Sequence, residues 1–360
     1  MALAGGVADG LFSWAAWPWG PNEMNTYVDA SYRQYLKGKP YMMPISPWFY
    51  TNLPGYNKNW MWRGDSLWFD RWQEALYLQP EWIEIISWND YGESHYIGPL
   101  RSKAYEAFTI GKAPFNFADG MDHDAWRLTL PFAIDLYVKN STTVTNEILT
   151  IWFRPNPARS CSTGGTTGNT VGQLQVEFQP YDVVQDAVFF TAVLASKPLS
   201  SSATIGGVAV PITWLSSPQS GVGLYHWSAP FSGRTGQVIV TVTTKAGAIS
   251  MSSGTRLITT ACTNGINNWN AWVGGKTGAA VSASPPSQDK LVCINGTGVY
   301  NFIGMCNYGC GIGYCPVGVC YCKQMGTQLP KPSPTNINAY PKAGLDESYS
   351  GLCAFNCANG

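Results

Sequence analysis

A largely apolar run at residues 82–86 leads directly into a loop that carries two carboxylates, and it constrains the fold more than any other segment. A short apolar run of this kind is typical of a strand buried in a parallel sheet. We expect the strand to end near Trp88, so that Asp90 and Glu93 follow its carboxyl end. One interpretation makes this loop a catalytic site. The other makes Asp90 a helix cap and Glu93 a solvated side chain.

Residues 1–141 alternate strand-like and helix-like segments. Strands are expected at 6–14, 40–46 and 82–88, and helices at 29–36, 66–76 and 126–137. This alternation indicates a parallel sheet with helical crossovers, and long polar and aromatic loops follow the strand ends. A (β/α)8 barrel carries its active site in such loops but needs about 250 residues. The predicted fold class is therefore α/β, with residues 1–141 as the C-terminal part of a (β/α)8 TIM-type barrel.

Residues 142–260 have a different pattern, with β-branched or alternating runs separated by Gly, Ser and Pro. Strands are expected at 145–153, 173–178, 187–194, 203–212 and 236–244. Short strands at this spacing are typical of a β-sandwich-like domain. His226, beside Trp227, is expected to be a packed residue rather than a ligand.

Residues 261–360 form a Cys-rich tail. Eight of the ten cysteines lie between Cys293 and Cys357, which indicates a disulfide framework and an oxidising compartment. The alternative, a zinc site, would need cysteine ligands alone, because no histidine follows His226. Residues 304–313 and 351–360 repeat one pattern, and Cys353 or Cys357 is expected to lack its partner. Residues 328–342, with several prolines, are expected to be a linker.

Composition narrows the function. Lys plus Arg and Asp plus Glu each number 22, so the net charge is zero, which argues against nucleic acid and anionic membranes as partners. Charged residues make up 12% of the chain and aromatic residues 14%, including 16 Trp. Aromatic faces pack against the C–H faces of sugars, and amides and carboxylates bind sugar hydroxyls. The composition thus favours an extracellular carbohydrate-active protein; the alternative is a large aromatic core.

Five segments form one ordered pattern. They are residues 9–14 (Asp-Gly-Leu-Phe-Ser-Trp), 39–50 (from Lys-Pro-Tyr-Met-Met-Pro to Trp-Phe-Tyr), 62–65 (Trp-Arg-Gly-Asp), 88–94 (Trp-Asn-Asp-Tyr-Gly-Glu-Ser) and 123–127 (His-Asp-Ala-Trp-Arg). Together they resemble the fungal α-1,3-glucanases, or mutanases, of glycoside hydrolase family 71. The resemblance is strong over residues 1 to about 155, and weaker motifs continue beyond.

The resemblance implies a secreted enzyme that hydrolyses α-1,3-glucan with inversion at the anomeric carbon. It places the essential carboxylates at Asp90 and Glu93, with Glu93 as acid and Asp90 as base. The motifs fit the latter half of the family's catalytic domain, so we expect a chain truncated at both ends and lacking its signal peptide. No cofactor or metal is expected, and the protein is expected to be a monomer. The alternative function is a non-catalytic carbohydrate- or cell-wall-binding protein.

Eight further residues are candidates for substrate binding. They are Trp14, Trp17, Trp48, Tyr50, Asp65, Trp88, Tyr91 and His95. The aromatic residues among them either stack on glucose rings or form the core at the top of a barrel. Asp65 either binds a sugar hydroxyl or caps a helix. His95 either tunes a carboxylate and binds sugar, or has a structural role.

Overall fold

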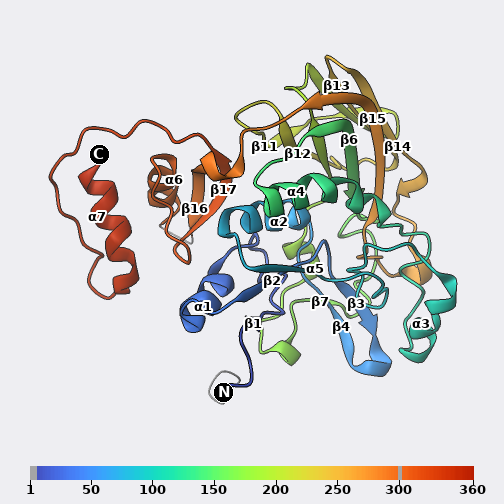
Figure 1. The fold of residues 1–360 in the computed structure, drawn as a ribbon. Coiled ribbons are helices and arrows are strands. Elements are labelled where there is room, and N and C mark those ends of the chain that lie inside the picture. The colour runs from blue at the N-terminus through green and yellow to red at the C-terminus, as the bar shows by residue number, and fades with distance from the viewer. Residues whose placement is uncertain (1–5, 299–301) are drawn as a thin grey trace.

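The computed structural model of this protein describes residues 6–298 and 302–360, which form five β-sheets with helices around them (Figure 1). The first sheet is parallel and has the order β1-β2-β5. Its strands and crossover helices are β1 (Leu11–Phe12), α1 (Tyr27–Leu36), β2 (Tyr41–Ile45), α2 (Leu67–Leu78) and β5 (Trp82–Ile85). The predicted βα alternation is thus present, but the described residues form no closed barrel, and three strands make up the whole parallel sheet.

Local chemistry explains where α2 ends. Gln79 adopts the left-handed conformation with φ of 47°, and its backbone N–H donates to the carbonyl of Ala75. Pro80 follows and has no N–H to continue the helix. The chain therefore turns into β5 within a few residues.

The long loop expected after β2 contains a hairpin. Strands β3 (Tyr50–Leu53) and β4 (Lys58–Met61) pair antiparallel, and β7 (Thr167–Gly168) pairs parallel with β4. The helical segments that follow β5 are α3 (Glu106–Ile110), the 3₁₀ helix η3 (Asp124–Thr129) and α4 (Leu130–Lys139). The helix expected over 126–137 is therefore split, because it starts as a 3₁₀ helix.

Two antiparallel sheets follow, with the orders β11-β12-β8-β6-β15 and β10-β9-β13-β14. Their strands are β6 (Val144–Phe153), β8 (Ala187–Leu194), β9 (Ser200–Ile205), β10 (Val208–Val210), β11 (Thr213–Ser216), β12 (Gly223–Pro230), β13 (Gly236–Thr244), β14 (Gly247–Ile258) and β15 (Trp272–Ala283). The two sheets face each other across one hydrophobic core, to which Ile151, Phe190, Ile205 and Val240 contribute.

Two of the expected strands differ from the observed ones. The run at 203–212 is divided between β9 and β10, because Gly206 and Gly207 both have positive φ and form a hairpin turn. The run at 173–178 is not a strand: it follows the 3₁₀ helix η4 (Val171–Gln173), and Phe178 alone bridges to Gly168. Exposure of Leu174 and Val176 shows that this apolar run has no sheet to pack against.

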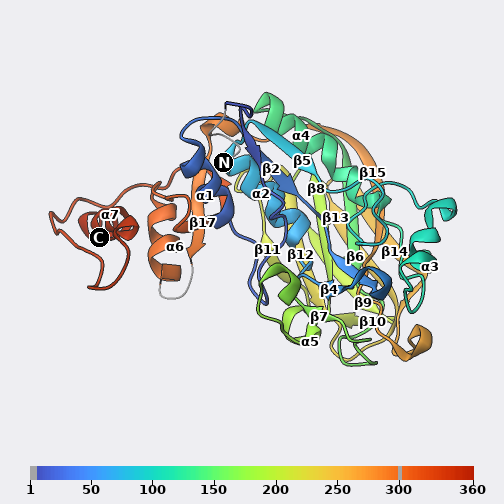
Figure 2. The same cartoon turned by 90° about the horizontal axis from the view of Figure 1, so that it is seen from below.

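The centre of the five-stranded sheet is buried on both faces. All eight residues of β8 are buried, and they alternate between two cores. Val188 and Phe190 pack toward the four-stranded sheet, whereas Phe189 packs with Trp68 and Trp72 of α2. The parallel sheet and its helices therefore cover the second face of the five-stranded sheet, as Figure 2 shows from below.

Polar contacts add to this junction. The indole N–H of Trp152 donates to the carbonyl of Asp65 at 2.7 Å, and His226 Nε2 lies 2.8 Å from Ser66 Oγ. The His226 ring is buried and stacks on Phe69, as expected of a packed residue. Burial lowers the pKa of His226 to about 3, so the ring is neutral in this interface.

The Cys-rich region contains an antiparallel pair of strands, β16 (Val292–Gly298) and β17 (Cys320–Gly326), and the helix between them in sequence, α6 (Ile303–Gly311), packs against the pair. The second copy of the sequence repeat forms α7 (Ser350–Ala358), which lies outermost in Figure 1. Residues 328–342 connect the two copies without helix or strand, as expected of a linker. We call residues 292–360 the Cys module.

The predicted disulfide framework is confirmed. The disulfides are Cys161–Cys262, Cys293–Cys322, Cys306–Cys320 and Cys310–Cys315. Cys353 and Cys357, both on α7, are free thiols. Among the described residues, no helix has the length and apolar character that crossing a membrane requires.

The disulfide between Cys161 and Cys262 should stabilise the fold more than the one between Cys310 and Cys315. The first joins residues 101 apart in sequence and the second residues five apart, and a longer closed loop restricts the unfolded chain more. Replacing Cys161 and Cys262 by Ala should lower the free energy of unfolding by roughly 2–5 kcal/mol. Replacing Cys310 and Cys315 by Ala is the matched control and should cost roughly half as much. Equal losses in urea unfolding would contradict the chain-entropy argument.

Candidate active site

The loop after β5 is closed by backbone hydrogen bonds at its base. Ser87 N–H donates to the carbonyl of His95 at 2.8 Å, and Ile97 N–H donates to the carbonyl of Ser87 at 2.9 Å. Gly98 N–H donates to the carbonyl of Trp88 at 2.8 Å. Residues 88–94 therefore form a fixed turn at the carboxyl end of the strand, which is where the sequence placed the two carboxylates.

Asp90 caps this turn and not a helix. Its Oδ1 accepts the backbone N–H of Glu93 at 3.0 Å, and its own N–H donates to Ser87 Oγ at 3.1 Å. The segment that follows Asp90 is a turn without helical hydrogen bonding. The Asp90 side chain is 47% exposed, so its carboxylate is open to a ligand from solution.

Glu93 lies deeper and has two donors. Its side chain is 13% exposed, Lys58 Nζ lies 2.6 Å from Oε1, and His95 Nε2 lies 2.9 Å from Oε2. Burial alone would raise the pKa of Glu93, but the hydrogen bonds from His95 and Lys58, with the charges of both partners, outweigh it. The pKa of Glu93 therefore lies below its usual range, and the carboxylate is ionised at neutral pH.

His95 connects the two carboxylates. Its buried ring places Nε2 between Glu93 Oε2 at 2.9 Å and Asp90 Oδ2 at 3.9 Å, while Nδ1 lies 2.8 Å from Ser87 Oγ. An ionised carboxylate only accepts hydrogen bonds, so Nε2 carries a proton and donates toward Glu93, while Nδ1 shares a hydrogen bond with the Ser87 hydroxyl. The ring thus has a fixed orientation and a fixed donor toward Glu93.

These side chains could in principle bind a metal ion, but the site already holds a positive charge. Single donor atoms of Asp90, Glu93 and His95 all lie within 4.8 Å of one another. The Lys58 ammonium occupies one oxygen of Glu93, and its charge repels a cation. The sulfurs of Cys293, Cys310 and Cys315 also cluster, but each is in a disulfide and offers no thiolate. The carboxylate cluster is therefore suited to proton transfer.

Aromatic rings surround His95. Trp17 and Phe49 lie 5.6 and 5.8 Å from its ring, and Trp62 stacks on Trp17 at 5.0 Å. Trp14 lies next to Trp17, with ring centroids 6.3 Å apart, and is 54% exposed. The aromatic cluster thus extends from a buried floor around the carboxylates to an exposed indole face.

The eight predicted binding residues fall into two groups. Trp14, Trp17 and His95 lie in or next to the carboxylate cluster, and Trp88 is 55% exposed on the same turn, with the Arg127 guanidinium 5.2 Å from its ring. The other four have buried side chains and partners within the protein. They are Trp48, Tyr50, Asp65 and Tyr91.

The partners of the buried group show what these residues do. The Trp48 indole N–H donates to the carbonyl of Trp269 at 2.9 Å, and the Tyr91 hydroxyl donates to the carbonyl of Pro99 at 2.7 Å. Asp65 pairs with Arg63 at 2.9 Å, and burial raises its pKa. Tyr50 contributes its backbone: its N–H donates to the carbonyl of Glu93 at 3.1 Å. These residues support the site and do not line it.

Sequence reasoning missed Lys58 and Ser87. Lys58 lies on β4, 35 residues before its partner Glu93, and reaches it only because the β3–β4 hairpin folds over the turn. One weak signal existed: residues 47–64 contain two basic side chains and no acidic one, so a carboxylate partner had to lie elsewhere. Ser87 carries no such signal, because a serine at a strand end is common.

Comparison with known proteins identifies a family and several relatives. The family pattern described as Glycosyl hydrolase family 71 matches residues 1–285. The chain is 32% identical over 277 residues, 76% of its length, to a glucan endo-1,3-alpha-glucosidase of Schizosaccharomyces pombe, and 39% identical over 197 residues, 52% of its length, to a mutanase of Penicillium rubens. It is 36% identical over 139 residues, 38% of its length, to an ascus wall endo-1,3-alpha-glucanase of Schizosaccharomyces pombe. The chain spans 59%, 41% and 31% of these relatives, respectively. No solved structure matches it significantly.

Removing the charge of Lys58 should raise the pKa of Glu93. In Lys58→Met the side chain keeps its length but loses the ammonium that favours the ionised carboxylate, so Glu93 should take up its proton at a higher pH. Carbon-13 NMR titration of the Glu93 carboxyl measures the change. Lys103→Met, at an exposed position of the 3₁₀ helix η2 (Ser102–Ala104), is the control and should leave the Glu93 titration unchanged. An unchanged Glu93 titration in Lys58→Met would show that His95 alone sets its ionisation.

Proposed function

The chain belongs to glycosyl hydrolase family 71, and we propose that it hydrolyses the α-1,3-glucosidic bonds of glucan, the bond named in its relatives. The observation that carries the proposal is the pair Asp90 and Glu93 on one turn, one carboxylate exposed and the other ionised and held by two donors. Glycoside hydrolysis needs two carboxyl groups in different protonation states at the same bond. The environments of Asp90 and Glu93 differ, because the Asp90 side chain is largely exposed and the Glu93 side chain is largely buried.

We assign the roles in the opposite sense to the expectation from sequence. A general acid must hold a proton, and the lowered pKa of Glu93 opposes that. Glu93 is therefore proposed as the base that removes a proton from the attacking water. Asp90, the other carboxyl group of the pair, is therefore proposed as the acid that protonates the leaving oxygen, in the protonated form that is favoured when bound glucan excludes water from its exposed side chain.

Inversion requires more room than the carboxylates have here. The closest oxygens of Asp90 and Glu93 lie within 4.8 Å, whereas inverting enzymes separate the two groups by about 6.5–9.5 Å. We propose that the Asp90 side chain turns outward when glucan enters and gives up its hydrogen bond from Glu93 N–H. Rotation about its Cα–Cβ bond to another staggered rotamer moves the carboxylate, and its exposure to solvent leaves that path open.

The exposed aromatic side chains near the carboxylates are proposed to bind the glucan. Trp14 and Trp88 present exposed indole faces, and Trp17 lies between Trp14 and His95. Glucose rings that pack on these faces would lie beside the carboxylates. The four buried candidates would act on binding only through the loops they support.

The remaining features of the chain extend the proposal. β1, β2 and β5 are proposed as successive strands of a (β/α)8 barrel, because they are parallel, joined by helices, and followed by the carboxylates at a carboxyl end. We propose residues 1–141 as the catalytic part, 142–260 as a β-sandwich-like domain, and 261–360 as a carbohydrate- or cell-wall-binding tail. Secretion is proposed from the four disulfides. A monomer with no nucleic-acid or membrane partner remains our proposal.

Glu93→Gln and Asp90→Asn should each lower the rate of glucan hydrolysis by at least about 100-fold, because each removes one proton-transfer step. Release of reducing ends from insoluble α-1,3-glucan measures the rate, and binding to the same glucan should persist. Glu106→Gln and Asp119→Asn make the same chemical changes at exposed positions outside the turn and should leave hydrolysis unchanged. Near-normal hydrolysis by Glu93→Gln would sink the proposed site, and binding without hydrolysis by the unmodified chain would favour a non-catalytic protein.

The first sugar released should be the β-anomer. An inverting reaction on an α-linked glucan places the incoming water on the opposite face of the ring, and mutarotation then produces the α form slowly. Proton NMR during the first minutes of hydrolysis distinguishes the two anomeric signals. Initial release of the α-anomer would show that the short separation of Asp90 and Glu93 is the working one and that the enzyme retains configuration.

A further inference from the structure

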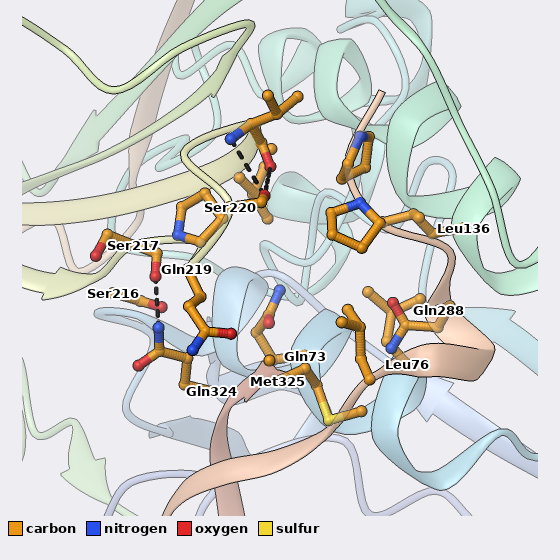
Figure 3. Close-up of a pocket in the computed structure, with 18 of the residues that line it drawn as sticks. Gln73, Leu76, Leu136, Ser216, Ser217, Gln219, Ser220, Gln288, Gln324 and Met325 are labelled. Carbon is orange, nitrogen blue, oxygen red and sulfur yellow. Dashed lines mark hydrogen bonds between the residues drawn. The ribbon is translucent and has the colours of Figure 1, made fainter. Parts of the chain in front are cut away.

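A cavity of about 250 Å³ lies where three parts of the chain meet (Figure 3). Its walls come from α2 and α4, from the turn between β11 and β12, from residues 285–291, and from the end of β17 in the Cys module. It shares no residue with the turn that carries Asp90 and Glu93. No step of the proposed hydrolysis uses it.

The polar lining of this cavity is neutral. Its side-chain amides and hydroxyls belong to Gln73, Gln219, Gln288, Gln324, Ser216, Ser217, Ser220 and Thr327. None of the described residues that line the cavity carries a charge, so a charged ligand would find no counter-ion there. Figure 3 shows that Gln73 and Gln288 face the space from different walls.

One lining amide is buried with an unused donor. Gln288 is 7% exposed, and its Nε2 finds no acceptor among the described residues. Its backbone N–H donates to the carbonyl of Asn140 at 2.7 Å, which fixes the residue in the wall. Trp72, also in the wall, has a buried indole N–H without an acceptor among the described residues. A buried donor without a partner destabilises the folded protein, and a ligand oxygen that accepts its hydrogen bond would remove this penalty.

We propose that this cavity is a second, non-catalytic binding site for a neutral saccharide. The ligand must accept hydrogen bonds from amides, carry no charge, and present apolar C–H groups to Phe132, Pro285 and Pro286. A pyranose ring meets all three conditions. A fatty chain fails the first condition, because it would leave the donor of Gln288 unpaired. The volume suits roughly one or two sugar rings, since pockets for larger ligands start near 300 Å³.

The Cys module completes the site. Gln324 Nε2 donates to the carbonyl of Ser217 at 2.6 Å, and Thr327 N–H donates to Gln219 Oε1 at 2.6 Å. These bonds hold the end of β17 against the β11–β12 turn and close one side of the cavity. A sugar bound here would therefore contact both the module and α2, and would stabilise the docked arrangement.

The choice of α-1,3-linked glucose as the sugar rests on the proposed function. The inference that the cavity binds a neutral saccharide rests on its lining residues alone. The test uses the full chain with Glu93→Gln, so that the ligand survives, and an α-1,3-linked glucotriose as probe in isothermal titration calorimetry. Two binding events are expected. Adding Gln288→Leu should weaken one of them about tenfold, the loss expected for one hydrogen bond, and leave the other unchanged.

Controls separate binding from folding. Gln73→Leu, at a half-buried position of α2 that lines the cavity, should weaken the same event, whereas Gln34→Leu makes the same change on α1 outside the cavity and should weaken neither. In the chain with Glu93 intact, Gln288→Leu should hydrolyse soluble oligosaccharide at the normal rate. Unchanged titration in both Gln288→Leu and Gln73→Leu would overturn the proposal, as would binding of decanoate without binding of the triose.

A crystal soaked with the triose gives the direct test. Density for a sugar hydroxyl within hydrogen-bond distance of Gln288 Nε2 would support the second site, and density at Asp90 and Glu93 alone would overturn it. The two proposals fail separately. Normal hydrolysis with a single binding event removes only the second site. If the chain without substitutions does not hydrolyse glucan but still binds the triose in the cavity, only the proposed function is removed.

Discussion

Burial of the central strands of the five-stranded sheet on both faces is the constraint on which the other parts depend. β8 has no exposed residue, and two adjacent residues of this strand, Phe189 and Phe190, pack into different cores. The parallel sheet, which has only three strands, buries its apolar residues by sharing the core around Phe189 and Trp152. A sheet covered on one side would expose that core to water, and the hydrophobic contribution of each large side chain would be lost. The α/β region and the antiparallel sheets therefore stabilise each other.

This junction also determines the chemistry of the carboxylates. The indole N–H of Trp48 donates to the carbonyl of Trp269, which lies just before β15 and so ties the start of the β3–β4 region to the five-stranded sheet. Tyr50, two residues on, holds the carbonyl of Glu93, and the hairpin that follows brings Lys58 to the Glu93 carboxylate. The segment that brings Lys58 to Glu93 is thus anchored by a hydrogen bond between Trp48 and Trp269, which lie 221 residues apart in sequence.

The sequence predicted the elements whose signals are local. The apolar run before Asp90 and Glu93, the crossover helices and the disulfide framework all depend on residues close together or on composition. The sequence could not predict that Trp14 is exposed and Trp48 buried, because a Trp at a strand end has the same local pattern in both cases. The contact between Trp48 and Trp269, which is distant in sequence, makes the difference. The run at 173–178 shows the converse: it has strand-like residues, but Leu174 stays exposed because no sheet lies beside it.

The comparison of two glutamates shows why geometry, and not titration alone, identifies the site. Glu74 is buried beside Arg71, yet burial and the shared Asp29 raise its pKa to about 7. Glu93 has a lowered pKa, because two donors serve it and no second carboxylate competes for them at the same distance. The pKa of each glutamate departs from its usual range, and the departure is large for Glu74. Arg71, however, also donates to the carbonyl of Pro44, so the Glu74 cluster joins α2 to β2 inside the core, out of reach of any substrate. Glu93 differs in standing on a turn with the exposed Asp90 beside it, and that accessibility is what permits a reaction.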